Sequence, residues 1–282
     1  MIPILFALIG ACFMTLYSLG IRLFLKDKGD SRSFTLILIL SGTVVLCFLL
    51  PFEKIHIELS TTFLFLIIPL ALLYTVVDLL FIRARQLEQV SVVSTFVQIG
   101  NIWALLGGAL FFQESITVLK IISVIAIVFG NVLLSWNGKR INISKGLYLI
   151  LVASFLFTLG NFIDKWYASF ISPSLYKLIL FIIEVIILSI FFVPNPVKSV
   201  VKEYELQGWK ALFVGPFLAL AVYFLVKAFE SGGEASRILP IFGLAQVFAV
   251  IAGIVILGER KNCIKKILAS IIVLIGAYLL NS

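Results

Sequence analysis

The sequence is poor in the residues on which most metal and hydrolase sites are built. It has a single histidine, His56, and only three cysteines. Cys12, Cys47 and Cys263 match neither a paired disulfide framework nor the spacing of zinc ligands. The chain also lacks an aspartate-rich diphosphate motif, a Gly-x-Ser-x-Gly elbow and a His-Glu-x-x-His pair. We therefore expect no metal, no cofactor and no enzyme activity.

Charged residues are equally scarce. They make up 13% of the 282 residues, against about 25% in soluble domains, whereas 62% of the residues are hydrophobic. Such a chain cannot cover a water-facing surface, so we expect an integral membrane protein. The formal net charge of +8 does not indicate nucleic acid, because the basic residues lie between apolar runs and not in one patch. The positive-inside rule explains them better.

Apolar stretches of membrane-spanning length recur along the whole chain. The first follows Met1 directly, without a convincing cleavage site, and is predicted to stay as a helix. A hydrocarbon layer of about 30 Å requires roughly 20 apolar residues per helix, and these runs do not alternate as barrel strands do. The predicted spans are residues 2–21, 34–51, 62–82, 91–112, 116–134, 146–162, 175–193, 211–226, 235–257 and 264–280. The longest polar connections are residues 25–33, 52–61, 137–145 and 195–208.

The two halves of the chain correspond in register. Ser91 precedes Glu114 by the same distance that separates Ser236 from Glu259, and one more apolar span follows each glutamate. A carboxylate at that hairpin is expected to cap the following span through the helix dipole. The halves thus predict an internal repeat.

The repeat divides the chain into residues 1–136, a connection of residues 137–145, and residues 146–282. Five spans per repeat is an odd number, so the second repeat must enter the membrane from the opposite side. We therefore predict an all-α membrane protein with ten transmembrane helices in two inverted five-helix repeats. Most basic residues fall in the odd-numbered connections, which places those connections in the cytoplasm and both termini outside. The even-numbered connections hold only Lys54, Lys120, Lys165, Lys177, Lys227 and Arg237.

With these features the chain resembles the EamA-like branch of the drug/metabolite transporter superfamily. The turn before the last span reads Gly258-Glu259, as is typical of that family, and the first half departs by one residue with Gln113-Glu114. Pro240 fits the family's proline in the second half. The resemblance covers nearly the whole chain. It implies transport of small metabolites such as amino acids or amines without ATP, which we expect to be export across the plasma membrane by a monomer or homodimer.

Glu184 is the most exceptional polar residue, because it lies near the middle of the seventh predicted span between isoleucine-rich segments. Polar residues at that depth are costly and usually functional. Glu184 either carries a coupling proton or is a neutral carboxyl satisfied by a neighbouring helix. No basic residue is predicted at the same depth, so a permanent ion pair is not expected.

Other polar residues inside spans are further candidates for the substrate site. Asp78 lies one turn beyond Tyr74, and pairing with Arg83 at the membrane edge is the alternative role for it. Gln98 and Asn101 share a helix face, where they bind substrate or join helices. The remaining candidates are Gln246, Asn161, Tyr17 and Tyr223, whereas Asp164 and Lys165 are expected to extend to the membrane interface.

We expect these candidates to line a cavity between the halves, formed by spans one, three, four, six, eight and nine. The partners implied are a small-molecule substrate, the lipid bilayer and protons as a coupling ion. An intramembrane enzyme and a membrane scaffold without transport activity are the alternative functions.

Overall fold

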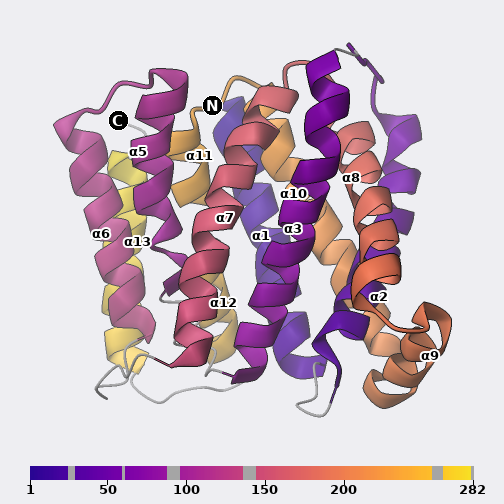
Figure 1. Cartoon of the computed structure of the whole chain (residues 1–282). Helices are drawn as coiled ribbons and strands as arrows, with labels where there is room; N and C mark the ends of the chain where they lie inside the picture. Colours follow the sequence, from indigo (N-terminus) through magenta and orange to yellow (C-terminus); the bar gives the residue numbers. More distant parts are fainter. Residues whose placement is uncertain (25–28, 59–60, 88–95, 136–143, 256–262, 281–282) are drawn as a thin grey trace.

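The computed structural model describes residues 1–282 except 25–28, 59–60, 88–95, 136–143, 256–262 and 281–282. Helices packed side by side account for most of the described chain (Figure 1). Seven of them are long and apolar enough to cross a membrane, and two shorter apolar helices, Gly100–Phe112 and Val118–Leu133, accompany them. The helices are α1 (Ile2–Phe24), α2 (Ser31–Leu49), η1 (Leu50–Phe52), α3 (Thr61–Leu87), α5 (Gly100–Phe112), α6 (Val118–Ser135), α7 (Lys145–Tyr167), α8 (Pro173–Ile187), η2 (Leu188–Phe192), α9 (Pro196–Gln207), η3 (Trp209–Phe213), α10 (Val214–Glu230), α11 (Ala235–Phe242), α12 (Ala245–Val255) and α13 (Cys263–Leu279).

The fourth and ninth predicted spans are interrupted, where the sequence suggested continuous helices. Gln98 and Ile99 form a turn before α5, and Gly243 and Leu244 form one between α11 and α12. Pro240, which has no backbone N–H to donate, lies in α11 shortly before the second turn. At both turns a backbone N–H donates to the carbonyl three residues earlier, whereas an α-helix pairs residues four apart. Asn101 N donates to Gln98 O at 3.0 Å, and Gln246 N donates to Gly243 O at 3.1 Å.

Residues 195–208, predicted as a polar connection, contain the helix α9. Proline at the first helical position favours its start, because a helix needs no N–H there. Asn195 with φ 50° precedes the helix and Gly208 with φ 82° ends it, so the chain turns sharply at both ends. In Figure 1, α9 lies outside the bundle, at the end opposite the N-terminus.

The two halves of the chain intermix. Helix α1 packs mainly against α10, α3 against α7, and α2 against both α10 and α8. Helices α6 and α13 pair with each other at one edge of the bundle, and α5 contacts α11 (Figure 1). Each of these contacts joins a helix of the first half to one of the second, so any cavity at the centre is built by both halves.

The crossing of α2 and α10 depends on Gly215. A Cβ atom there would lie 2.0 Å from the Leu38 carbonyl oxygen, which is backbone and cannot rotate away. We therefore expect Gly215→Ala to force the helices apart and destabilise the protein by about 3 kcal/mol. The thermal unfolding midpoint in detergent measures this effect. Gly100→Ala is the control, because the nearest atom to its added Cβ is the Thr158 hydroxyl at 3.2 Å; equal losses in both variants would contradict the prediction.

Candidate functional site

A cavity of about 310 Å³ lies at the centre of the bundle. Residues of α1, α3, α7, α10, α11 and α12 line it, together with those at the turn before α5. These correspond to the six predicted spans, and α8 of the seventh adds Lys177, Phe181 and Glu184. The sequence candidates that line the cavity are Tyr17, Tyr74, Asp78, Gln98, Asn101, Glu184 and Gln246. Asn161 and Tyr223 lie outside it.

Glu184 faces this cavity from α8. The residue is only 2% exposed, and its Oε2 atom has no hydrogen-bond partner among the described residues. Lys177 lines the same cavity from two helical turns earlier in α8, and no ion pair joins it to Glu184 among the described residues.

Asp164 holds Lys177 in place. Its carboxylate accepts hydrogen bonds from Lys177 Nζ at 2.7 Å, Tyr74 Oη at 2.7 Å and Tyr176 Oη at 2.6 Å. The residue is 1% exposed, so its side chain packs inside the bundle and does not extend outward to the membrane interface as expected. Four side chains from three helices, α3, α7 and α8, thus form one buried polar cluster. A satisfied carboxylate of this kind costs far less to bury than an isolated one.

Asp78 lies one turn from Tyr74 and faces the cavity as well. Arg83 is not its partner, because this exposed side chain donates to Gln86 Oε1 at 3.1 Å. The positive charges that act on Asp78 are Arg85 and Lys177. The Arg85 guanidinium also lies 5.2 Å from the centre of the Tyr17 ring. Asp78, Arg85 and Lys177 thus line the same cavity.

The two helix interruptions meet at the cavity. Asn101 Nδ2 donates to Gln98 Oε1 at 2.8 Å, and Gln98 Nε2 lies 3.5 Å from the Gly243 carbonyl oxygen. The roles of helix contact and cavity lining, which the sequence left as alternatives, are thus combined in these amides. Interrupted helices offer backbone groups to a ligand that continuous helices keep for themselves.

Asn161 and Tyr223, the last two sequence candidates, contact other parts of the protein. Asn161 is buried and donates from Nδ2 to the Phe157 carbonyl at 2.7 Å in its own helix. Tyr223 Oη donates to the Glu53 carboxylate at 3.3 Å, toward the end of α10. The structure therefore does not bring these two side chains to the cavity.

We call the end of the bundle at which α1 begins and α2 ends the even side, and the opposite end the odd side. Buried carboxylates tie the halves together on the even side. Glu53 accepts from Lys227 Nζ and from Ser174 N at 2.9 Å. Such contacts join one half's connection to the other half's helices on this side.

Glu114 makes the equivalent contacts elsewhere on the even side. It accepts from Lys165 Nζ and from the backbone nitrogens of Ala235 at 2.7 Å and Ser236 at 2.9 Å. It therefore caps α11 of the other half, whereas the sequence suggested that it caps the following helix α6. The matching residue Glu259 lies outside the described residues.

These two carboxylates have pKa values set by opposing effects. Burial raises the pKa of Glu53, but hydrogen bonds from Lys227 and Ser174 outweigh it and lower the pKa below its ordinary range. Burial likewise raises the pKa of Glu114, and its hydrogen bonds from Lys165 and Ser236 again lower it overall. The contacts thus stabilise the junction of the halves on the even side fully above the ordinary carboxyl pKa of about 4.3, and this stabilisation is lost as the pH falls through the lowered values.

We expect acid to loosen the even side. Spin labels on Ser115→Cys and Ser231→Cys, in a background without the native cysteines, report the separation across the Glu114 contacts. Pulsed electron resonance should find longer distances at about pH 3, below the lowered pKa values, than at pH 7. Glu114→Gln should give the longer distances at both pH values. Identical distance distributions at the two pH values in the labelled protein that keeps Glu114 would contradict the prediction.

One comparison with known proteins shows the family. The sequence model of the EamA-like transporter family matches residues 1–136 and 144–282. One solved crystal structure of a protein superposes with a TM-score of 0.68 at 12% sequence identity, covering 98% of each chain, and so shares the fold. No curated protein matches the sequence. The helices of spanning length fit an integral multi-pass membrane protein, and the chain belongs to the EamA-like transporter family of the drug/metabolite transporter superfamily.

Proposed function

We propose that this protein is a secondary-active transporter that exports small metabolites carrying an ammonium group, such as amino acids or amines, across the plasma membrane. The observation that carries the proposal is the central cavity with the carboxylates of Asp78 and Glu184 in it. Glu184 has an oxygen without a hydrogen-bond partner among the described residues, although it is almost fully buried. A buried polar atom of this kind is satisfied when a donor, such as a ligand ammonium, enters the cavity.

Ten spans in two inverted five-helix halves are part of this proposal. In the two proposed halves α1 corresponds to α7, and α3 corresponds to α10. The contact of α1 with α10 in one half's terms is therefore the contact of α7 with α3 in the other's. The interruptions at Gln98 and Gly243 also fall at matching places in the two halves. In Figure 1, α1 begins and α13 ends at the same end of the bundle, as an even number of crossings requires. Inverted halves with interrupted helices are typical of transporters that work by alternating access.

Access to the cavity differs between its two ends. Arg85 and Gln86, at the end of α3, line it toward the odd side, whereas Glu53 and Glu114 join the halves on the even side. We infer that transport alternates between this arrangement and one in which the even-side contacts are broken and the odd side is closed. The basic odd-numbered connections favour a cytoplasmic odd side, from which a substrate for export would enter.

Counterflow in proteoliposomes tests the proposal. Amino acids and amines that raise the unfolding temperature of the purified protein are loaded inside the vesicles, and uptake of trace labelled compound is followed. A transporter accumulates the label transiently without any added energy source. Failure of every stabilising compound to exchange, with unchanged compound recovered, would favour a scaffold, and a new product in the mass spectrum would favour an intramembrane enzyme.

A further inference from the structure

Helix α9 lies on the odd side, outside the bundle of apolar helices (Figure 1). It connects η2, which ends the seventh predicted span, to η3 and α10 of the eighth. The turns at Asn195 and Gly208 set it apart from both neighbouring helices. Its place between two spans puts α9 at the boundary between lipid and water.

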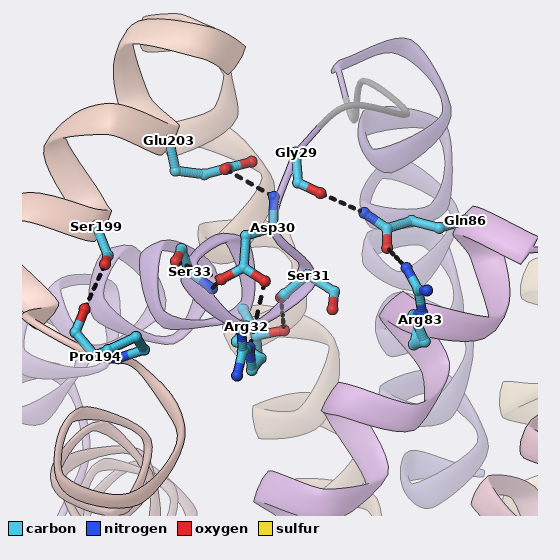
Figure 2. A network of polar contacts seen from close by, with 11 residues as sticks. Gly29, Asp30, Ser31, Arg32, Ser33, Arg83, Gln86, Pro194, Ser199 and Glu203 are labelled. Atoms are coloured by element: carbon cyan, nitrogen blue, oxygen red, sulfur yellow. Dashed lines mark hydrogen bonds and ion pairs between the residues drawn. The ribbon is translucent and has the colours of Figure 1, made fainter.

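The flank of α9 that faces the protein carries two buried polar residues beside Val200, which packs against the bundle. Glu203 and Gln207 are buried on it, and Gln207 Nε2 donates to Glu203 Oε1 at 2.7 Å. Glu203 Oε2 in turn accepts from the Asp30 backbone nitrogen at 3.0 Å, which Figure 2 shows. A Cβ atom on Gly29 would lie 2.3 Å from Glu203, so glycine permits this close approach. These contacts fix the rotation of α9 about its own axis.

The segment of Gly29 and Asp30, which contacts α9, is also bound by α3. Gln86 Nε2 donates to the Gly29 carbonyl oxygen at 3.0 Å, as Figure 2 also shows. Because Gln86 lines the cavity, α9 is attached to the odd-side end of the proposed substrate pathway. The helix is therefore part of the folded transporter and not a loose connection.

The outward flank of α9 carries an apolar stripe. Val197, Val201 and Tyr204 recur at spacings of four and three residues, so they share a face, and their exposed fractions are 80%, 50% and 40%. Trp209, which follows the helix, is 58% exposed. These three residues turn outward, whereas the apolar residues of a water-facing helix turn to the protein. Tryptophan and tyrosine are also enriched where membrane and water meet.

A basic stripe runs beside the apolar one. Lys198 and Lys202 each follow an apolar residue of the stripe by one position, and both are exposed. No ion pair involves either of them in the described part of the chain. Glu205 is the acidic residue on this flank, and Lys210 beyond Gly208 adds a further positive charge. An apolar stripe beside a net positive one is the pattern of helices that lie in a membrane surface.

We propose that α9 is a binding surface for anionic phospholipids of the odd-side leaflet. The apolar stripe enters the boundary between headgroups and acyl chains, and Lys198 and Lys202 bind the lipid phosphates. Charge complementarity selects anionic over zwitterionic headgroups, because only the former carry a net negative charge. The proposal does not depend on what the cavity transports.

Native mass spectrometry of the detergent-purified protein tests this, with phosphatidylglycerol and phosphatidylcholine as the two probes. Lys198→Gln with Lys202→Gln should weaken phosphatidylglycerol binding by about fivefold per lysine, and leave phosphatidylcholine binding unchanged. Lys54→Gln with Lys145→Gln is the matched control, since it removes the same charge from exposed lysines away from α9.

The outcomes distinguish specific binding of anionic lipid from unspecific lipid contact. A selective loss of phosphatidylglycerol in the α9 variant, absent from the control, supports the proposal. Equal binding of the two lipids to the parent protein, or equal loss in both double variants, would overturn it in favour of unspecific lipid contact. A third double variant, Val197→Ser with Val201→Ser, should weaken both lipids, because the apolar stripe contacts acyl chains of either kind; unchanged binding there would also count against the proposal.

Discussion

Replacing Lys177 with methionine is expected to destabilise the protein by about 3–5 kcal/mol. The substitution keeps the length of the side chain but leaves the Asp164 carboxylate buried without its cation. Tyr74 and Tyr176 still donate to Asp164, yet two hydroxyl groups do not neutralise a charge that is 1% exposed. The midpoint of thermal unfolding in detergent measures the effect.

The double variant Lys177→Met with Asp164→Asn separates charge from packing. It removes both members of the ion pair, so no buried charge is left alone, and most of the lost stability should return. Arg32→Gln serves as the reference for an exposed pair, because Arg32 and Asp30 are both well exposed and such pairs contribute about 0–1 kcal/mol. A double variant as unstable as Lys177→Met alone would show that Lys177 acts through packing and not through Asp164.

Hydropathy was sufficient to predict the class of fold. The all-helical membrane protein and its family are confirmed, because long apolar runs and the Gly258-Glu259 turn are local features of the sequence. Glu184 could be singled out for the same reason, since a carboxylate among isoleucines is conspicuous without any knowledge of neighbours. Its place at a cavity required the structure.

Contacts between distant segments were beyond the sequence. Asp164 and Lys177 each looked like residues near the end of a span, and no periodicity within one helix shows that they meet. Glu114 was correctly expected to cap a helix, but the helix is α11 of the other half. The amphipathic helix α9 was missed because its lysines and glutamates read as a polar connection, although Pro196 and Gly208 at its ends are ordinary helix boundary signals.

We expect Glu184 to be the residue that couples transport to protons. An ionised carboxylate near the centre of a bilayer costs at least about 2.5 kcal/mol, whereas the neutral form avoids most of that cost. Lys177 does not remove this asymmetry, because its ammonium is already bound to Asp164. A carboxyl that is exposed to water from alternate sides can therefore exchange its proton during each cycle. Glu184→Gln keeps the shape and the hydrogen-bonding capacity of the side chain but cannot titrate.

We expect Glu184→Gln to fold and bind substrate yet lose accumulation driven by a pH gradient, while counterflow exchange continues at a rate similar to the parent. Exchange persists because it needs substrate on both sides but no net proton movement. Asp78→Asn is the matched control, since it removes a second carboxylate from the same cavity. If Glu184→Gln accumulates substrate under a pH gradient as well as the parent does, Glu184 is structural. Loss of that accumulation in Asp78→Asn, with counterflow exchange retained, would then assign the coupling proton to Asp78, the remaining carboxylate among the described residues that line the cavity.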